Sequence, residues 1–198
     1  MKRIWLGILI VTVGALLLAA GCRTMRGAYE SAPYRPVRSE GKFALRDYPA
    51  LTVVETPMAG SDGGDGSFLR LFRFLTGDNA RKQQIAMTTP VFLTGSSSHR
   101  TMAFVLPAKL PAGAVPAPSD RTLAVRELPA GRFAVLRFSG GRNAQNEAAA
   151  LSRLQAWLAQ EGLTARSGPV YAYFDPPWTP VFFRRNEVML RIDGEKPE

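Results

Sequence analysis

The sequence contains one cysteine, Cys22, and one histidine, His99, among its 198 residues. A single cysteine cannot form a disulfide within the chain, and one cysteine with one histidine cannot complete a structural zinc site. A hydrolytic triad also needs a histidine beside its nucleophile, and His99 is the one histidine in the sequence that could take that role. The scarcity of both residue types argues against triad hydrolysis, and we expect a protein that is not an enzyme and has no metal site.

Acidic residues are also few, since 16 Asp and Glu face 25 Lys and Arg, and the formal net charge is +9. An excess of basic residues favours anionic partners, such as phospholipid head groups, a small molecule with carboxylates, or nucleic acid. Nucleic-acid-binding proteins usually concentrate Lys and Arg in a stripe, together with aromatic residues that stack on bases. The arginines here are scattered from Arg23 to Arg191. We therefore expect no nucleic-acid partner.

The first 22 residues have the layout of an export signal. Lys2 and Arg3 precede an apolar run over residues 4–20, and small residues then lead to Cys22. A charged start, an apolar middle and a small-residue cleavage site are typical of a secretory signal peptide, which we assign to residues 1–21. The stretch before the cysteine resembles the signals of bacterial lipoproteins, in which the cysteine thiol receives a diacylglycerol and the chain is cut just before it.

Lipidation would also explain an odd cysteine in an exported chain. The alternative is an uncleaved N-terminal membrane helix, because residues 4–21 reach the roughly 18-residue length that spans a bilayer. Both interpretations place the rest of the chain outside the cytoplasm, and lipidation implies a periplasm-facing protein of the bacterial cell envelope. Residues 22–42 contain Pro33 and Pro36 and show no sustained periodicity. We predict a lipidated tether there and one folded domain over residues 43–193.

The predicted domain contains an internal repeat. Residues 45–50 (LRDYPA) recur 80 residues later as residues 125–130 (VRELPA), and in the same register Gly60 corresponds to Gly140. Both copies then run into a segment with helical periodicity. The shared order and register indicate a duplicated unit.

Each copy contains a helical pattern followed by candidate strands. Apolar residues at helical spacing are Phe68, Leu71, Phe72 and Leu75 in the first copy, and Leu151, Leu154 and Leu158 in the second. Asp65 or Ser67 can cap the first helix and Gly77 can end it, whereas Asn143 or Asn146 can cap the second. The candidate strands after the helices are residues 90–93, 102–106, 170–174 and 187–192. This order predicts an α+β fold, in which two strand–helix–strand–strand units form antiparallel sheet with the helices packed outside.

Several segments, taken together in this order, resemble the SOUL family of haem-binding proteins. They are residues 34–37 (YRPV), 43–48 (FALRDY), 68–75 (FLRLFRFL), 85–91 (IAMTTPV), 102–107 (MAFVLP) and 185–188 (RNEV). The resemblance covers about residues 34–192. It implies a duplicated βαββ motif that forms a distorted antiparallel β-barrel, in agreement with the repeat.

The resemblance further implies that haem or another tetrapyrrole binds in an apolar groove beside the first helix. A porphyrin is a flat apolar plate with two carboxylates at one edge, so it needs apolar side chains under the ring and cations near the propionates. The apolar candidates are Met58, Phe68, Leu71, Phe72, Leu75 and Met87. The cationic candidates are Arg70, Arg73, Arg81 and Lys82. The competing interpretation is that the helix stripe packs on its own sheet and that the arginines form a solvated face.

His99 follows a Gly-Ser-Ser-Ser turn, which is typical of an exposed loop and not of an axial haem ligand. We therefore expect weak haem binding, through the groove alone or with a Met or Tyr near the iron. Other functions stay open at this point. They are a structural or interaction lipoprotein without a small ligand, a small-molecule effector binder, and a hydrolase of the related barrel class. Two carboxylates in strand-like segments, Glu55 and Glu187, are expected on the solvent face.

Mass spectrometry of the mature N-terminus tests the predicted anchor. We expect a chain that begins at Cys22 and carries a diacylglycerol, because the peptidase cuts before the modified cysteine. An intact Met1 on the purified protein would contradict the lipoprotein assignment and favour the uncleaved helix.

Overall fold

The computed structural model describes residues 29–59, 64–96 and 99–193. The predicted signal peptide and Cys22 lie outside the described residues. The large sheet contains β2 (Arg35–Glu40), β3 (Phe43–Tyr48), β4 (Leu51–Met58), β6 (Val91–Ser96), β7 (His99–Val105), β8 (Ala124–Leu128), β9 (Gly131–Phe138), β10 (Val170–Tyr173) and β11 (Asn186–Ile192). The other elements are β1 (Glu30–Ser31), β5 (Thr88–Thr89), α2 (Ser67–Leu75), α3 (Ala144–Gln160) and the 3-10 turn η1 (Ala112–Ala114).

The order of the strands in the sheet agrees with the predicted duplication. Across the sheet the order is β2-β3-β9-β11-β10-β6-β7-β4-β8, with every pair antiparallel. If β2 is left out, the strands at equal positions from the two ends of the sheet are equivalent strands of the two copies. These pairs are β3 and β8, β9 and β4, β11 and β7, and β10 and β6. β4 and β9 begin 80 residues apart, at Leu51 and Gly131, in the register of the sequence repeat. The first strand of each copy pairs with the other copy, so the two halves share one sheet.

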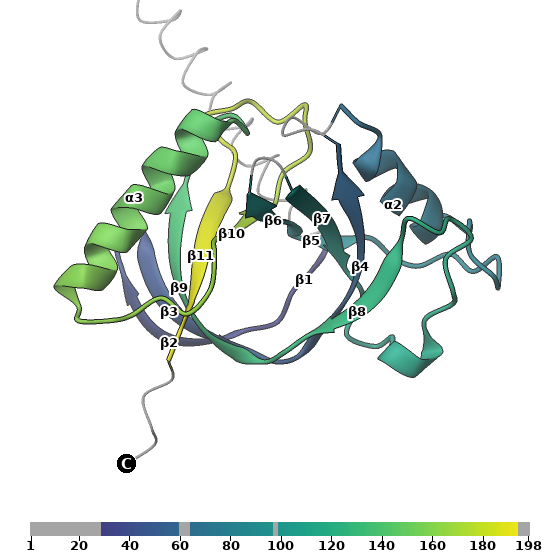
Figure 1. Ribbon diagram of the computed structural model, residues 1–198, viewed down its shortest axis with the longest axis horizontal. Helices are drawn as coiled ribbons and strands as arrows, with labels where there is room; N and C mark the ends of the chain where they lie inside the picture. Colours follow the sequence, from purple (N-terminus) through teal and green to yellow (C-terminus); the bar gives the residue numbers. More distant parts are fainter. Residues whose placement is uncertain (1–28, 60–63, 97–98, 194–198) are drawn as a thin grey trace, which may run out of the picture.

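The sheet is strongly curved but open, so the prediction of a closed barrel is wrong (Figure 1). Closure would require the two outermost strands of the repeats, β3 and β8, to pair. The free edge of β3 is instead occupied by β2, which pairs with it from Arg35 opposite Asp47 to Glu40 opposite Phe43. Over the described residues, the correct description is a mixed α+β fold with one large antiparallel sheet and two α-helices.

Strand β2 and strand β1 fall within residues 22–42, which the sequence analysis assigned to a tether. β1 pairs in parallel with β5, and β2 forms one edge of the large sheet. The folded part therefore begins before residue 43. Every residue of β2 is exposed, so the strand has no buried face and no alternation of apolar residues that could have predicted it.

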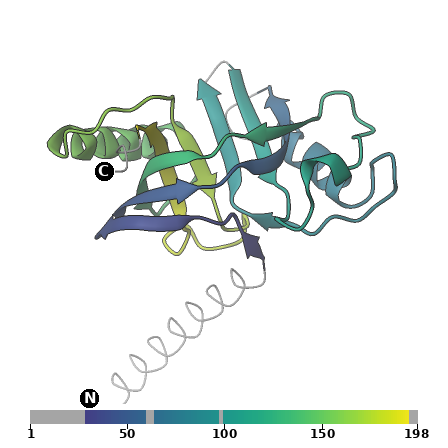
Figure 2. The same cartoon turned by 90° about the horizontal axis from the view of Figure 1, so that it is seen from below.

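The two helices lie at opposite ends of the molecule and pack on the same face of the sheet (Figure 2). The Asp65 carboxylate accepts hydrogen bonds from the backbone N–H groups of Ala59 and Ser67, at 2.6 and 3.1 Å. Gly77, with a φ of 112°, follows the last turn of α2. The Asn143 side chain accepts a hydrogen bond from Asn146 N–H at 2.8 Å before α3. The N-cap residue of α2 is Gly66, which lies between the predicted Asp65 and Ser67, whereas Asn143 caps α3 as predicted and Gly77 follows the C-cap Thr76. Neither of the described helices has the length and apolar character of a membrane span.

Both faces of the curved sheet are covered by apolar side chains. The helix face is buried under residues such as Leu71, Phe74, Leu154 and Leu158. The opposite face has its own core, formed by Ala32, Tyr48, Leu51, Val53, Phe92, Ala103, Val105, Val135, Ala172 and Met189. The central strands are therefore buried on both sides. This burial explains why the prediction of a solvent-facing Glu187 is wrong, since the residue is fully buried.

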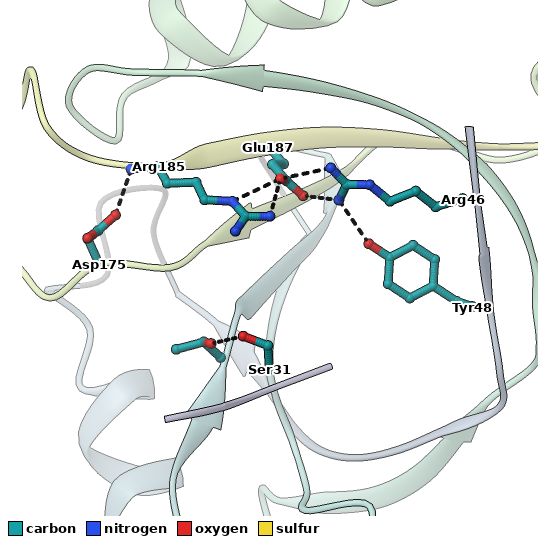
Figure 3. A network of polar contacts seen from close by, with 7 residues as sticks. Ser31, Arg46, Tyr48, Asp175, Arg185 and Glu187 are labelled. Atoms are coloured by element: carbon teal, nitrogen blue, oxygen red, sulfur yellow. Dashed lines mark hydrogen bonds and ion pairs between the residues drawn. The ribbon is translucent and has the colours of Figure 1, made fainter. Parts of the chain in front are cut away.

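A buried ionic network surrounds Glu187 on the face opposite the helices (Figure 3). The Glu187 carboxylate accepts hydrogen bonds from Arg46 on β3, at 2.8 and 3.3 Å, and from Arg185, at 2.7 and 3.0 Å. Burial alone lowers the pKa of Arg46, but the hydrogen bonds and charge of Glu187 outweigh it, so the pKa of Arg46 lies above its ordinary value. The Arg46 guanidinium also lies 4.4 Å from the centre of the Tyr34 ring. One carboxylate thus joins β3, β11 and the segment that precedes β11.

Replacement of the central carboxylate should be strongly destabilising. Glu187→Ala leaves the Arg46 and Arg185 guanidinium groups without their shared acceptor, and we expect a loss of about 3–5 kcal/mol in the free energy of unfolding. Arg126→Ala is the control, because it breaks an exposed ion pair with Glu55 and should cost less than about 1 kcal/mol. Urea unfolding of the two variants measures both values. An equal cost for the two variants would contradict the importance of the buried network.

Candidate functional site

An apolar groove runs between α2 and the loop that joins β10 to β11. Its volume is about 400 Å³. The lining residues are Tyr29, Phe68, Phe72, Met87, Thr88, Thr89, Val91, Tyr173, Phe174, Asp175, Pro176, Pro177 and Trp178. The rings of Phe68 and Phe72 lie within 11° of parallel, with centres 6.3 Å apart. α2 therefore lines one side of the groove with two parallel aromatic rings.

A second cavity of about 470 Å³ adjoins the groove and is more polar. The two cavities share Phe68, Val91, Tyr173, Asp175 and Pro177. The second cavity is also lined by Met102, Arg142, Arg184 and Asn186. The combined site is therefore apolar beside α2 and carries two guanidinium groups at its other end.

Three of the predicted apolar residues meet at this groove. Phe68 and Phe72 are exposed on α2, at 42% and 39%, and Met87 lies in the segment between α2 and β5. These three side chains line the groove beside the first helix, where the sequence analysis expected a ligand to bind.

The other predicted apolar residues do not line the groove. Leu71 and Leu75 are buried under α2, and Met58 is buried at the end of β4. Residues at i, i+3, i+4 and i+7 cover a face that is wider than the contact of a short helix with its sheet. Here one side of that face packs on the sheet and only its border, at Phe68 and Phe72, reaches the groove.

The predicted cationic residues do not line the groove either. Arg70 donates hydrogen bonds to Thr56 Oγ1 at 3.3 Å and to the Pro57 carbonyl at 2.9 Å, so it holds α2 against β4. Arg73 is exposed on α2. Arg81 donates to the Ala114 carbonyl at 3.1 Å, and Lys82 is exposed. A residue that is close in sequence to groove residues can still point its side chain to another side of the helix. The sequence pattern alone does not show that direction.

The outer wall of the groove comes from residues 174–178, none of which the sequence analysis named as a site residue. The loop is held in place by its own polar contacts. Asp175 accepts a hydrogen bond from Arg185 N–H at 2.6 Å, and Arg184 donates to the carbonyls of Thr179 and Pro177. The signal in the sequence was a run of prolines and aromatic residues within one turn, which is unusually apolar for a loop.

Tyr173 forms part of the inner wall and connects it to a buried ion pair. Its phenol donates a hydrogen bond to Glu147 at the start of α3, and Arg100 donates to the same carboxylate at 2.7 Å. Burial raises the pKa of Tyr173 above its ordinary value, and the hydrogen bond to Glu147 raises it further. Tyr173 therefore stays protonated at neutral pH and presents its ring to the site.

The described residues hold no group of three His, Cys, Asp or Glu side chains arranged for a metal ion. His99 is exposed at the start of β7 and does not line the groove. The groove therefore offers one thioether, Met87, and the phenols of Tyr29 and Tyr173 as possible iron ligands.

Solved structures of similar shape confirm the fold class. The C-terminal domain of EcmrR matches with a TM-score of 0.56 and 13% identity, over 81% of this chain and 98% of that one. A hydrolase from Listeria innocua matches with a TM-score of 0.60 and 9% identity, over 79% and 94% of the two chains. An uncharacterized conserved protein from the same organism gives 0.59 and 10%, over 77% and 92%. At such identities the likeness concerns the fold alone.

Comparison with curated protein sequences gives no significant match. The model of one protein family, described as SOUL heme-binding protein, matches residues 29–191. This range spans the described fold from the residue before β1 to Arg191, one residue before the end of β11, and it includes both walls of the groove. The chain belongs to the SOUL heme-binding family.

Proposed function

We propose that this protein is a periplasm-facing lipoprotein of the bacterial envelope that binds haem or a related tetrapyrrole in the groove beside α2, without catalysing a reaction. One observation carries the proposal: a member of this family has an open groove between the parallel rings of Phe68 and Phe72 and the loop at Phe174 and Trp178. The envelope location rests on the signal-like segment before Cys22.

The size and shape of the groove suit a flat apolar ligand. Its 400 Å³ lies within the range of about 300–1,000 Å³ that small-molecule sites occupy. A smaller cavity of about 200 Å³ lies on the opposite face of the sheet, beside Leu51, Phe92 and Met189, and falls below that range. A planar ring against parallel aromatic side chains gains both apolar burial and stacking. The groove is therefore the favoured site.

The charged end of the site suits the propionates. Arg142 and Arg184 line the cavity that adjoins the groove, so a plate against Phe68 can direct its carboxylates toward them. Guanidinium groups bind carboxylates through paired, charge-assisted hydrogen bonds. In this proposal Arg142 and Arg184 take the role that the sequence analysis gave to Arg70 and Arg73.

The ligands available to iron favour weak binding. Haem would supply its own redox and gas-binding chemistry. This chain would shield one face of the ring from water and fix the orientation of the ring in the groove. Met87 is a soft thioether, and the protonated phenol of Tyr173 is engaged by Glu147. Tight binding through a histidine is not expected, because His99 lies outside the groove.

Absorption titration of the purified full chain with hemin tests the groove. Phe68→Ala combined with Phe72→Ala should weaken binding about tenfold or more, since it removes the aromatic wall. Leu69→Ala is the matched control, because Leu69 is 49% exposed on the same helix and does not line the groove. Circular dichroism of each variant checks the fold. A Soret change that persists unaltered in the double variant would overturn the proposed site.

A second experiment tests the direction of the carboxylates. Arg142→Ala should weaken hemin binding about three- to tenfold and leave the binding of hemin dimethyl ester unchanged, because the ester lacks the negative charges. Arg73→Ala, at an exposed position on α2, should affect neither ligand. Equal losses of both ligands in Arg142→Ala would contradict a contact between this guanidinium and a propionate.

A further inference from the structure

Large apolar side chains are exposed on the loop that forms the outer wall of the groove. Trp178 is 73% exposed, Phe182 67% and Val181 49%, and all three lie on the β10–β11 loop. Phe68 and Phe72 on the facing wall are also exposed. A soluble surface seldom gathers so many large apolar groups unless a partner covers them. We refer to Trp178, Val181 and Phe182 as the loop tip.

The backbone around the loop tip is fixed by hydrogen bonds. Thr179 N–H donates to the Pro176 carbonyl at 3.0 Å, and Phe183 N–H donates to the Pro180 carbonyl at 2.9 Å. The Val181 carbonyl accepts a hydrogen bond from Gly140 N–H at 3.0 Å, which ties the tip to the end of β9. The tip therefore presents its apolar side chains on a braced turn and cannot readily fold them inward.

The N-terminal part of the chain enters the fold at the same groove. Tyr29 lines the groove, and Cys22 stands only seven residues earlier in the sequence. Seven residues span at most about 25 Å when fully extended. A lipid on Cys22 would therefore hold the groove within that distance of the bilayer. This step rests on the envelope anchoring proposed above.

The surrounding charge also fits a bilayer of anionic lipids. Arg184 follows the tip, Arg142 lies across the adjoining cavity, and the chain without Lys2 and Arg3 of the signal peptide keeps 23 basic and 16 acidic residues, a net charge of +7. Tryptophan and phenylalanine flanked by basic residues are typical of surfaces that sit at the boundary between head groups and acyl chains. A bilayer is thus the partner that matches both the apolar tip and its charge.

We propose that the loop tip inserts into the outer part of the membrane to which the chain is tethered, so that the groove opens toward the lipid. An amphipathic ligand could then enter from the bilayer without crossing water. The tip residues Val181 and Phe182 do not line the groove, so they serve membrane docking alone.

Fluorescence of Trp178 in vesicles tests this docking. The lipidated protein loses Trp5 with residues 1–21, so its tryptophans are Trp157, which is buried, and Trp178. In vesicles of phosphatidylcholine and phosphatidylglycerol, doxyl-labelled lipid should quench about half of the Trp178 emission. Val181→Ser combined with Phe182→Ser should abolish most of this quenching and leave hemin affinity in detergent unchanged. Val37→Ser, which alters an exposed valine on β2, should retain it.

The outcomes separate docking from the other proposals. Vesicle-bound protein whose Trp178 is not quenched, or quenching that survives in the double variant, would overturn docking and leave anchoring and haem binding intact. Quenching that is lost in the double variant supports docking even where hemin fails to bind.

Discussion

The buried carboxylate of Glu187 is the contact on which the arrangement of the site depends. It lies between two guanidinium groups, Arg46 from β3 and Arg185 from the end of the β10–β11 loop. Such a cluster is stable only when all of its charges are paired, because each ion has lost its water. Arg185 also stacks on Phe174, with its guanidinium carbon 4.1 Å from the ring centre, and its backbone binds Asp175. The position of the outer groove wall is therefore set by an ion cluster on the opposite face of the sheet.

The duplication explains the scaffold, and the differences between its halves explain why the groove lies beside α2. At the offset of 80 residues, Phe74 in α2 corresponds to Leu154 in α3, and both are fully buried. The same offset places Ala148 and Ser152 where α2 has Phe68 and Phe72. α3 thus keeps the residues that pack on the sheet and lacks the aromatic wall. The aromatic side chains of α2 therefore come from the first half of the fold, and the second half supplies the loop on the other side of the groove.

The proposed ligand site and the proposed membrane surface share one loop. Its inner side, at Phe174 and Pro177, lines the groove, while its tip carries the exposed Trp178 and Phe182. A single braced turn can therefore hold a ligand and orient the opening of the groove. A haem-binding protein tethered to a membrane would gain from this arrangement, since a tetrapyrrole is more soluble in lipid than in water. The scarcity of iron ligands in the groove fits the weak haem binding proposed above.

The sequence by itself determined the family, the duplication, the two helices and the Asn143 cap of α3, because these depend on local spacing and on short segments. It also led to the aromatic edge of α2 and to Met87. Only the tertiary structure decided which residues around the groove face it. Leu71 and Leu75 turned to the sheet, Arg70 to β4, and Arg142 and Arg184 came from distant parts of the chain. The open sheet, with β2 at its edge, and the burial of Glu187 were likewise decided by long-range strand pairing, which a pattern read along one segment does not contain.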